Sequence, residues 1–173
     1  VSVAPNSNPY KIILTVTDNR TRLQNYEQFY LSVYSNLGKG LVVADTRDGI
    51  NTDLNLIMSQ NFTESFTQKF DEKDNIILKN VYSTTNGGNA ISGLVTYMMT
   101  SVHDSYKRTL TVITDHSVRR MDPYDYVLEK TNNDIFYIPI PEDRFKPMCL
   151  MYDNSALYEV MIVDHDVYAR RIR

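Results

Sequence analysis

Three polar residues, Asp18, Asn89 and Asp115, have the types and the chain positions that would suit a metal ion. Asp18 and Asp115 each follow an apolar run typical of a buried strand, and Asn89 precedes a predicted helix. Such positions meet at the carboxyl edge of an open α/β sheet. Two carboxylates and an amide oxygen suit a hard cation such as magnesium. The alternative is that Asn89 and Asp115 only cap loops and helices.

Other residue combinations give weaker indications of chemistry. The Gly87-Gly88 pair could cradle a phosphate at a helix start, but it matches neither of the glycine-rich nucleotide-binding motifs. Residues 103–105 (His-Asp-Ser) and 115–117 (Asp-His-Ser) contain the residue types of hydrolytic triads. No serine lies in a GxSxG sequence, which would indicate a nucleophile elbow.

Size and composition are those of an ordinary globular protein. The chain has 173 residues, of which 42% are hydrophobic and 23% charged, so one domain can bury a sizeable core. A net charge of −3 gives no reason to expect a nucleic-acid partner. The single cysteine, Cys149, excludes an internal disulfide. No apolar stretch approaches the length of a membrane span.

Two short sequences fit the acceptor pattern for N-linked glycosylation, at Asn19 (Asn-Arg-Thr) and at Asn61 (Asn-Phe-Thr). They favour an extracellular or secreted protein, and an intracellular location is the alternative. The chain does not begin with Met, as would be the case for a processed protein or a piece of a larger one.

Apolar spacing predicts strands that alternate with helices. The predicted strands are Tyr10–Thr17, Leu41–Ala44, 54–58, Thr109–Thr114, Ile135–Ile140 and Leu157–Val163. The predicted helices are 23–37, 62–70, 91–102, one starting at Asp122-Pro123, and Asp164–Ile172. This alternation implies an α/β fold with a doubly wound, mostly parallel sheet of about six strands and helices on both faces. Asp48-Gly49 is a hairpin turn signal that adds one antiparallel edge strand.

Several stretches give the chain a resemblance to von Willebrand factor A domains. YKIILTVTD resembles the family's first strand, TTNGGNAISGL its Gly-Gly-Thr loop and the helix after it, and RTLTVITDHS its fourth parallel strand. DIFYIPIP and LYEVMIVDHDVYARRI resemble its last two strands and closing helix. The likeness implies one Rossmann-like domain over residues 1–173, complete in itself or one module of a larger protein.

The metal-ion-dependent adhesion site of that family implies roles for five residues here. Asp18 and Asp115 match two of its metal-ligating aspartates. Arg20 and Arg22 stand where the family has two serines, and Asn89 stands where it has a threonine. A guanidinium repels a cation, so the resemblance implies a degenerate site in which arginine replaces the metal. We therefore expect no cofactor, with magnesium on Asp18, Asn89 and Asp115 as the alternative.

Two classes of function are compatible with these observations. The first, which we expect, is a non-enzymatic, metal-independent module for adhesion or matrix assembly that binds another protein, such as a matrix or cell-surface component. Most members of that family act as interaction domains rather than enzymes. The second is an α/β hydrolase or a nucleotide-dependent enzyme that uses Asp18 and Asp115 at the sheet edge. An arginine-filled site would favour the binding module, and an open pocket with perturbed acids would favour the enzyme.

Overall fold

Strands dominate the computed structural model of the chain, which describes residues 9–31, 37, 39–61, 63, 75–103, 107–153 and 158–171. They belong to two units, 1–38 and 39–173. Every strand pair among the described residues is antiparallel. In the same part of the chain, no helix is both long enough and apolar enough to cross a membrane.

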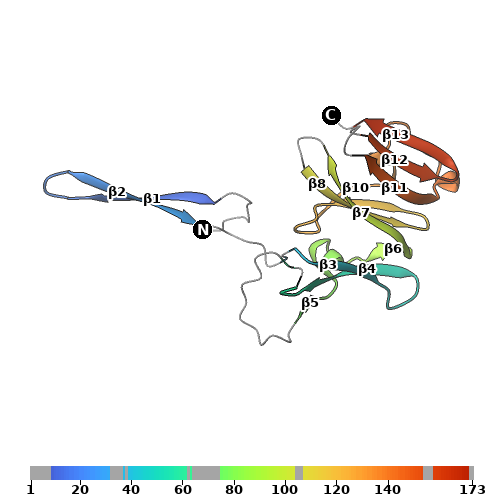
Figure 1. Ribbon diagram of the computed structural model, residues 1–173, viewed down its shortest axis with the longest axis horizontal. Coiled ribbons are helices and arrows are strands. Elements are labelled where there is room, and N and C mark those ends of the chain that lie inside the picture. Colours follow the sequence, from blue (N-terminus) through green and yellow to red (C-terminus); the bar gives the residue numbers. More distant parts are fainter. Residues whose placement is uncertain are drawn as a thin grey trace. The chain divides into compact units, whose positions relative to one another are not determined.

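The first unit is a two-stranded hairpin of β1 (Tyr10–Thr17) and β2 (Gln24–Leu31), drawn in blue in Figure 1. Its register pairs Tyr10 with Leu31 and runs without a shift to Thr17 and Gln24. Isoleucine, valine and threonine fill β1, and these residues fit an extended backbone well.

The second unit begins with a sheet in which β4 is central. The elements are β3 (Leu41–Asp45), β4 (Asn51–Met58), β5 (Ile76–Leu78) and β6 (Ile91–Ser92), of which β3, β5 and β6 all pair with β4. Side chains of β4 alternate between buried and half-buried, so one face of the strand lines the core. The short helix α1 (Val81–Thr85) packs on β4 and buries Val81 and Tyr82.

Two further sheets complete the second unit. The first has the order β10-β9-β8-β7 and consists of β7 (Val95–His103), β8 (Lys107–Thr114), β9 (Val118–Met121) and β10 (Leu128–Thr131). The other is the meander of β11 (Pro147–Asp153), β12 (Tyr158–Val163) and β13 (Asp166–Arg171). Two short 3₁₀ helices, Asn132–Ile135 and Glu142–Arg144, lie between β10 and β11.

The main hydrophobic core brings together these last two sheets, which lie against each other in Figure 1. Phe136 sits at its side, with its ring edge-on to Phe145 and Tyr168 at centroid distances of 5.8 and 5.3 Å. The buried core residues are Ile113, Val118, Ile135, Ile140, Phe145, Leu150, Met161 and Val163. This packing is a β-sandwich, in which inward-facing side chains of both sheets interdigitate.

A buried ion pair joins the two sheets of the sandwich. Arg120 of β9 lies 2.6 Å from Glu159 of β12, from Nη2 to Oε2, and both side chains are 4% exposed. Arg170 Nε of β13 approaches the same carboxylate oxygen at 3.4 Å. Burial lowers the pKa of Arg120, and the neighbouring Glu159 carboxylate opposes that shift.

The predicted doubly wound α/β fold is wrong, because its helices are strands. Segment 23–37 contains β2, segment 91–102 contains most of β6 and β7, and the predicted closing helix Asp164–Ile172 contains β13. An all-antiparallel arrangement also excludes the Rossmann-like von Willebrand A architecture that the resemblance implied.

Other parts of the prediction had mixed outcomes. The strand Tyr10–Thr17 and the β3–β4 hairpin around Asp48-Gly49 are confirmed. The hairpin was predicted to add an edge strand, which is wrong, because β4 is the central strand of its sheet. The helix expected at Asp122-Pro123 is a turn, in which the Asp122 carbonyl accepts the Tyr126 N–H at 2.9 Å. Residues 135–140, predicted as a strand, are the end of a 3₁₀ helix followed by irregular chain. The predicted helix 62–70 lies outside the described residues except for Thr63.

Candidate functional site

Asp18 closes the turn of the first unit's hairpin. Its Oδ1 accepts the backbone N–H groups of Arg20 at 2.7 Å and Thr21 at 3.1 Å. The bond from the Arg20 N–H is the main cause that lowers the pKa of Asp18, followed by those from Thr21. The turn ends at Arg22, which has a positive φ of 62° and donates its N–H to the Asp18 carbonyl. This is the usual role of aspartate in a turn.

The other candidate ligands lie in the second unit. Asn89 is exposed between α1 and β6, and Asp115 lies in the turn between β8 and β9. Because Asp18 belongs to the first unit, the vestigial site of Asp18, Arg20, Arg22, Asn89 and Asp115 stays a prediction. No group of three or more histidine, cysteine, aspartate or glutamate side chains suited to a metal occurs among the residues that the structure describes.

One face of the first unit's hairpin is apolar. Residues that pair directly across an antiparallel ladder share a face, so Ile12 and Phe29 lie on the same face, as do Tyr10 and Leu31. Alternation along β1 adds Leu14 and Val16 to it. We call this set the apolar hairpin face: Tyr10, Ile12, Leu14, Val16, Phe29 and Leu31, with Asn25 and Glu27 as its polar members. Among them Leu14 is 54% exposed and Val16 61% exposed.

The opposite hairpin face is more polar. It carries Lys11, Thr15, Thr17, Gln24 and Gln28, together with Ile13, Tyr26 and Tyr30. A two-stranded hairpin with a single apolar face is marginally stable in water on its own. The contrast between the two faces therefore indicates a surface that is built to be covered.

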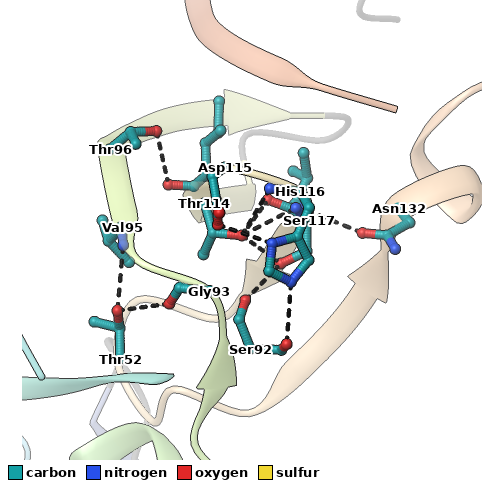
Figure 2. Close-up of polar contacts among 12 residues, drawn as sticks. Thr52, Ser92, Gly93, Val95, Thr96, Thr114, Asp115, His116, Ser117 and Asn132 are labelled. Carbon is teal, nitrogen blue, oxygen red and sulfur yellow. Dashed lines mark hydrogen bonds and ion pairs between the residues drawn. The ribbon is translucent and has the colours of Figure 1, made fainter. Parts of the chain in front are cut away.

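In the second unit, a serine, a histidine and an aspartate are linked in series (Figure 2). Ser92 Oγ of β6 lies 3.1 Å from His116 Nε2, and His116 Nδ1 lies 2.8 Å from Asp115 Oδ1. One tautomer satisfies both contacts, with Nδ1–H donated to the carboxylate and Nε2 accepting the serine hydroxyl proton. The same order of contacts activates the serine in hydrolytic triads.

The β8–β9 turn holds Asp115 and His116 in place. Thr114 donates its backbone N–H to the Ser117 carbonyl at 2.8 Å, and Thr114 Oγ1 accepts the Ser117 N–H at 2.9 Å. Ser117 is buried, and its hydroxyl donates to the Ser92 carbonyl at 3.2 Å. These bonds join β6 to the β8–β9 turn. Ser92 is therefore positioned against His116 by the backbone of β6 and of this turn (Figure 2).

Gly93 allows the close approach of β6 to this turn. It is buried and has a φ of +94°, and its N–H donates to the Ile50 carbonyl at 3.1 Å. A Cβ at this position would lie 2.7 Å from both Thr114 Oγ1 and His116 Cε1, and closer still to Asp115 Oδ1. Only glycine fits this space and this backbone conformation without strain.

A polar cleft lies on the side of β4 to which Ser92 belongs. Ser92 pairs with Asn51, whereas the neighbouring pair of Thr52 and Ile91 is buried, so Ser92 and Asn51 share the outer face. Asn51 lines a cleft of about 180 Å³ together with Asp45, Arg47, Asp48, Asp53, Asn80 and Ala90. Backbone N–H groups, with that of Asn51 as the largest cause, strongly lower the pKa of Asp48.

The sequence indicates part of this arrangement. Asp115, His116 and Ser117 have the residue types of hydrolytic triads, but Ser117 is buried and bonded to Thr114. Ser92 and Gly93 were missed, because they approach the turn through strand pairing rather than through a local motif. Comparison of the chain with protein-family models, with curated proteins and with solved structures finds no match.

Proposed function

We propose that the chain is a protein-interaction module that assembles with a second copy of itself through the hairpin of its first unit. The observation that carries the proposal is the exposure of apolar side chains on the apolar hairpin face. Its central residues Ile12, Leu14 and Phe29 are 43%, 54% and 49% exposed. Exposed apolar faces of this kind, with polar residues beside them, mark interaction sites.

The second edge of β1, along which no strand of the described residues pairs, supports a second copy as the partner. β1 pairs with β2 along one edge, and these two strands are the whole sheet among the described residues. Its eight residues contain neither proline nor glycine, and Lys11 is their single charge. Such an edge is an unprotected template for another strand.

Antiparallel pairing of β1 with β1 of a second copy keeps like faces together. Directly opposed residues share a face, so Leu14 of one copy lies opposite Ile12 or Leu14 of the other. The result is a four-stranded sheet with one continuous apolar face, which exceeds the minimum of three strands for independent stability. A two-fold axis relates the copies, as in most homodimers.

We predict that Leu14→Lys abolishes self-association, because it places a charge at the centre of the apolar hairpin face. The matched control is Thr15→Lys, which puts the same charge on the next residue of the same strand, on the opposite face. Sedimentation velocity over a wide concentration range should show dimers or larger assemblies for the unaltered chain and for Thr15→Lys, and monomers for Leu14→Lys. A monomeric unaltered chain would contradict the proposal, as would equal behaviour of the two variants.

The location proposed for this module is extracellular, and both glycosylation sequons support it. Asn19 is exposed in the hairpin turn, and Asn61 is exposed in the turn after β4. We predict that the chain expressed through a eukaryotic secretory pathway carries glycans at both positions. Glycosidase treatment should increase its electrophoretic mobility, and Asn19→Gln and Asn61→Gln should each remove one step of that shift. An unaltered mobility would contradict the prediction.

A further inference from the structure

We propose that Ser92 is the nucleophile of a hydrolytic site for small esters, with His116 as its general base and Asp115 as the residue that orients the histidine. This activity is independent of the proposed assembly through the first unit. It rests on the two contacts that link Ser92, His116 and Asp115 in series, 3.1 Å and 2.8 Å long. The first lies within the range expected between a nucleophile and its base, and the second within the range expected between the base and the residue that orients it.

The arrangement is more than a stabilising contact between two strands. The backbone link between β6 and the turn is already made by the buried Ser117, whose hydroxyl donates to the Ser92 carbonyl. The Ser92 hydroxyl is exposed, so water competes with its bond to His116 and the bond contributes little to folding. A solvent-facing serine held against a histidine is instead accessible to a substrate.

The chemical step is an acyl transfer to serine followed by hydrolysis. Ser92 Oγ bonds to the acyl carbon while its proton passes to His116 Nε2. The ester C–O bond then breaks, and the alcohol leaves with that proton. Water, deprotonated in turn by His116, attacks the acyl-serine, releases the carboxylic acid and restores Ser92.

The cleft lined by Asn51, the residue with which Ser92 pairs, indicates the class of ester. Its volume of about 180 Å³ limits the bound group to a small one. Three carboxylates, from Asp45, Asp48 and Asp53, outnumber the one guanidinium, from Arg47. This balance favours esters with a cationic or uncharged alcohol and disfavours anionic esters.

The exposure of the site limits the expected rate. The side chains of His116 and Asp115 are 54% and 63% exposed, so water screens the contact between them. Enzymes gain most from such groups in dry, preorganised sites. We therefore expect slow turnover and choose covalent labelling of Ser92 as the primary measurement.

A fluorophosphonate probe tests the nucleophile directly. The Ser92 oxygen would displace fluoride from phosphorus, and mass spectrometry would place the adduct on the peptide that contains Ser92. Ser92→Ala should abolish labelling, and His116→Asn should slow it by about 10²-fold or more, as expected for the loss of a general base. Ser83→Ala and His165→Asn, which alter a serine and a histidine outside the site, should label like the unaltered chain. No adduct on the unaltered chain, or an adduct that survives Ser92→Ala, would overturn the proposal.

Hydrolysis of acetyl esters tests the substrate class. Acetylcholine supplies a cationic alcohol part, phenyl acetate a neutral one, and acetylsalicylate an anionic one. The unaltered chain should hydrolyse the first two faster than the third, and Asp45→Asn should lower the ratio of the rates for acetylcholine and acetylsalicylate. Preference for the anionic ester would overturn the substrate class, and hydrolysis of none of the three would overturn the activity.

Discussion

Replacing Glu159 with leucine is expected to lower the free energy of unfolding by about 3–5 kcal/mol, because it leaves a charged arginine buried without its partner. Arg120 contacts Glu159 at 2.6 Å, and both side chains are 4% exposed. Burial already opposes the charged form of Arg120, and its pKa is lowered for that reason. Removal of the carboxylate removes the interaction that offsets this penalty.

Replacing both partners separates the cost of an unpaired buried charge from the contribution of the ion pair itself to stability. The double variant Arg120→Met with Glu159→Leu leaves no buried charge between the two sheets, so it should recover most of the stability lost in Glu159→Leu. Arg170 also approaches Glu159, but its side chain is 35% exposed and can turn to water. Urea unfolding of the two single variants and the double variant completes the cycle.

An exposed pair supplies the control for this cycle. Lys107 and Glu129 form an ion pair between β8 and β10, with Lys107 54% exposed and Glu129 28% exposed. Glu129→Leu should change stability by about 0–1 kcal/mol, because water screens this pair. Equal losses for Glu159→Leu and Glu129→Leu would contradict the burial of the Arg120–Glu159 pair.

Strands with an unambiguous local signal were the predictable part of the fold. Six of the eight residues of β1 have high strand propensity, and Tyr10–Thr17 matches its predicted bounds. The Asp48-Gly49 signal also marked a true hairpin, in which Asp48 Oδ1 accepts the N–H groups of Ile50 at 2.8 Å and Asn51 at 2.7 Å. In both places the short-range chemistry determines the conformation without help from distant residues.

β2 was misread because its aromatic residues recur at helical spacing and do not alternate as in a half-buried strand. Tyr26, Phe29 and Tyr30 recur at helical spacing, which predicted a helix. In the strand, Phe29 lies on the apolar hairpin face, while Tyr26 and Tyr30 lie on the opposite one. Tyrosine and phenylalanine favour strands, and pairing with β1 selects the strand over the helix. That pairing is made with the preceding strand across the hairpin turn, so a helical period measured within 23–37 does not include it.

The sequence of the turn before β13 is not typical of a hairpin. Asp164 and His165 both have positive φ, 47° and 69°, as the two-residue turn between Val163 and Asp166 requires. Asn-Gly or Asp-Gly is the usual sequence for that turn, so Asp-His was read as the start of a helix. The same limit applies to the site, where Ser92 and His116 are 24 residues apart and meet through sheet pairing.

Gly93→Ala is the second substitution with a large expected effect, about 2–4 kcal/mol of lost stability. A φ of +94° is strained for alanine, and the new methyl group would lie 2.7 Å from Thr114 Oγ1 and from His116 Cε1. Thr114 is buried, and its Oγ1 accepts the Ser117 N–H, so Thr114 cannot move away without losing this hydrogen bond of the turn. His116 and Asp115 would be pushed away from Ser92.

Gly87→Ala separates the backbone strain of that substitution from its contacts. Gly87 has a similar positive φ of 74°, but a Cβ there would meet nothing within 4 Å. Its replacement should therefore cost only the backbone term, about 1–2 kcal/mol. Thermal and urea unfolding should show that Gly93→Ala is much less stable than Gly87→Ala. Fluorophosphonate labelling of Ser92 should be lost in Gly93→Ala and kept in Gly87→Ala. Equal stability of the two variants would show that β6 does not approach the turn this closely. Labelling that persists in a folded Gly93→Ala variant would show that the reactivity of Ser92 does not depend on His116.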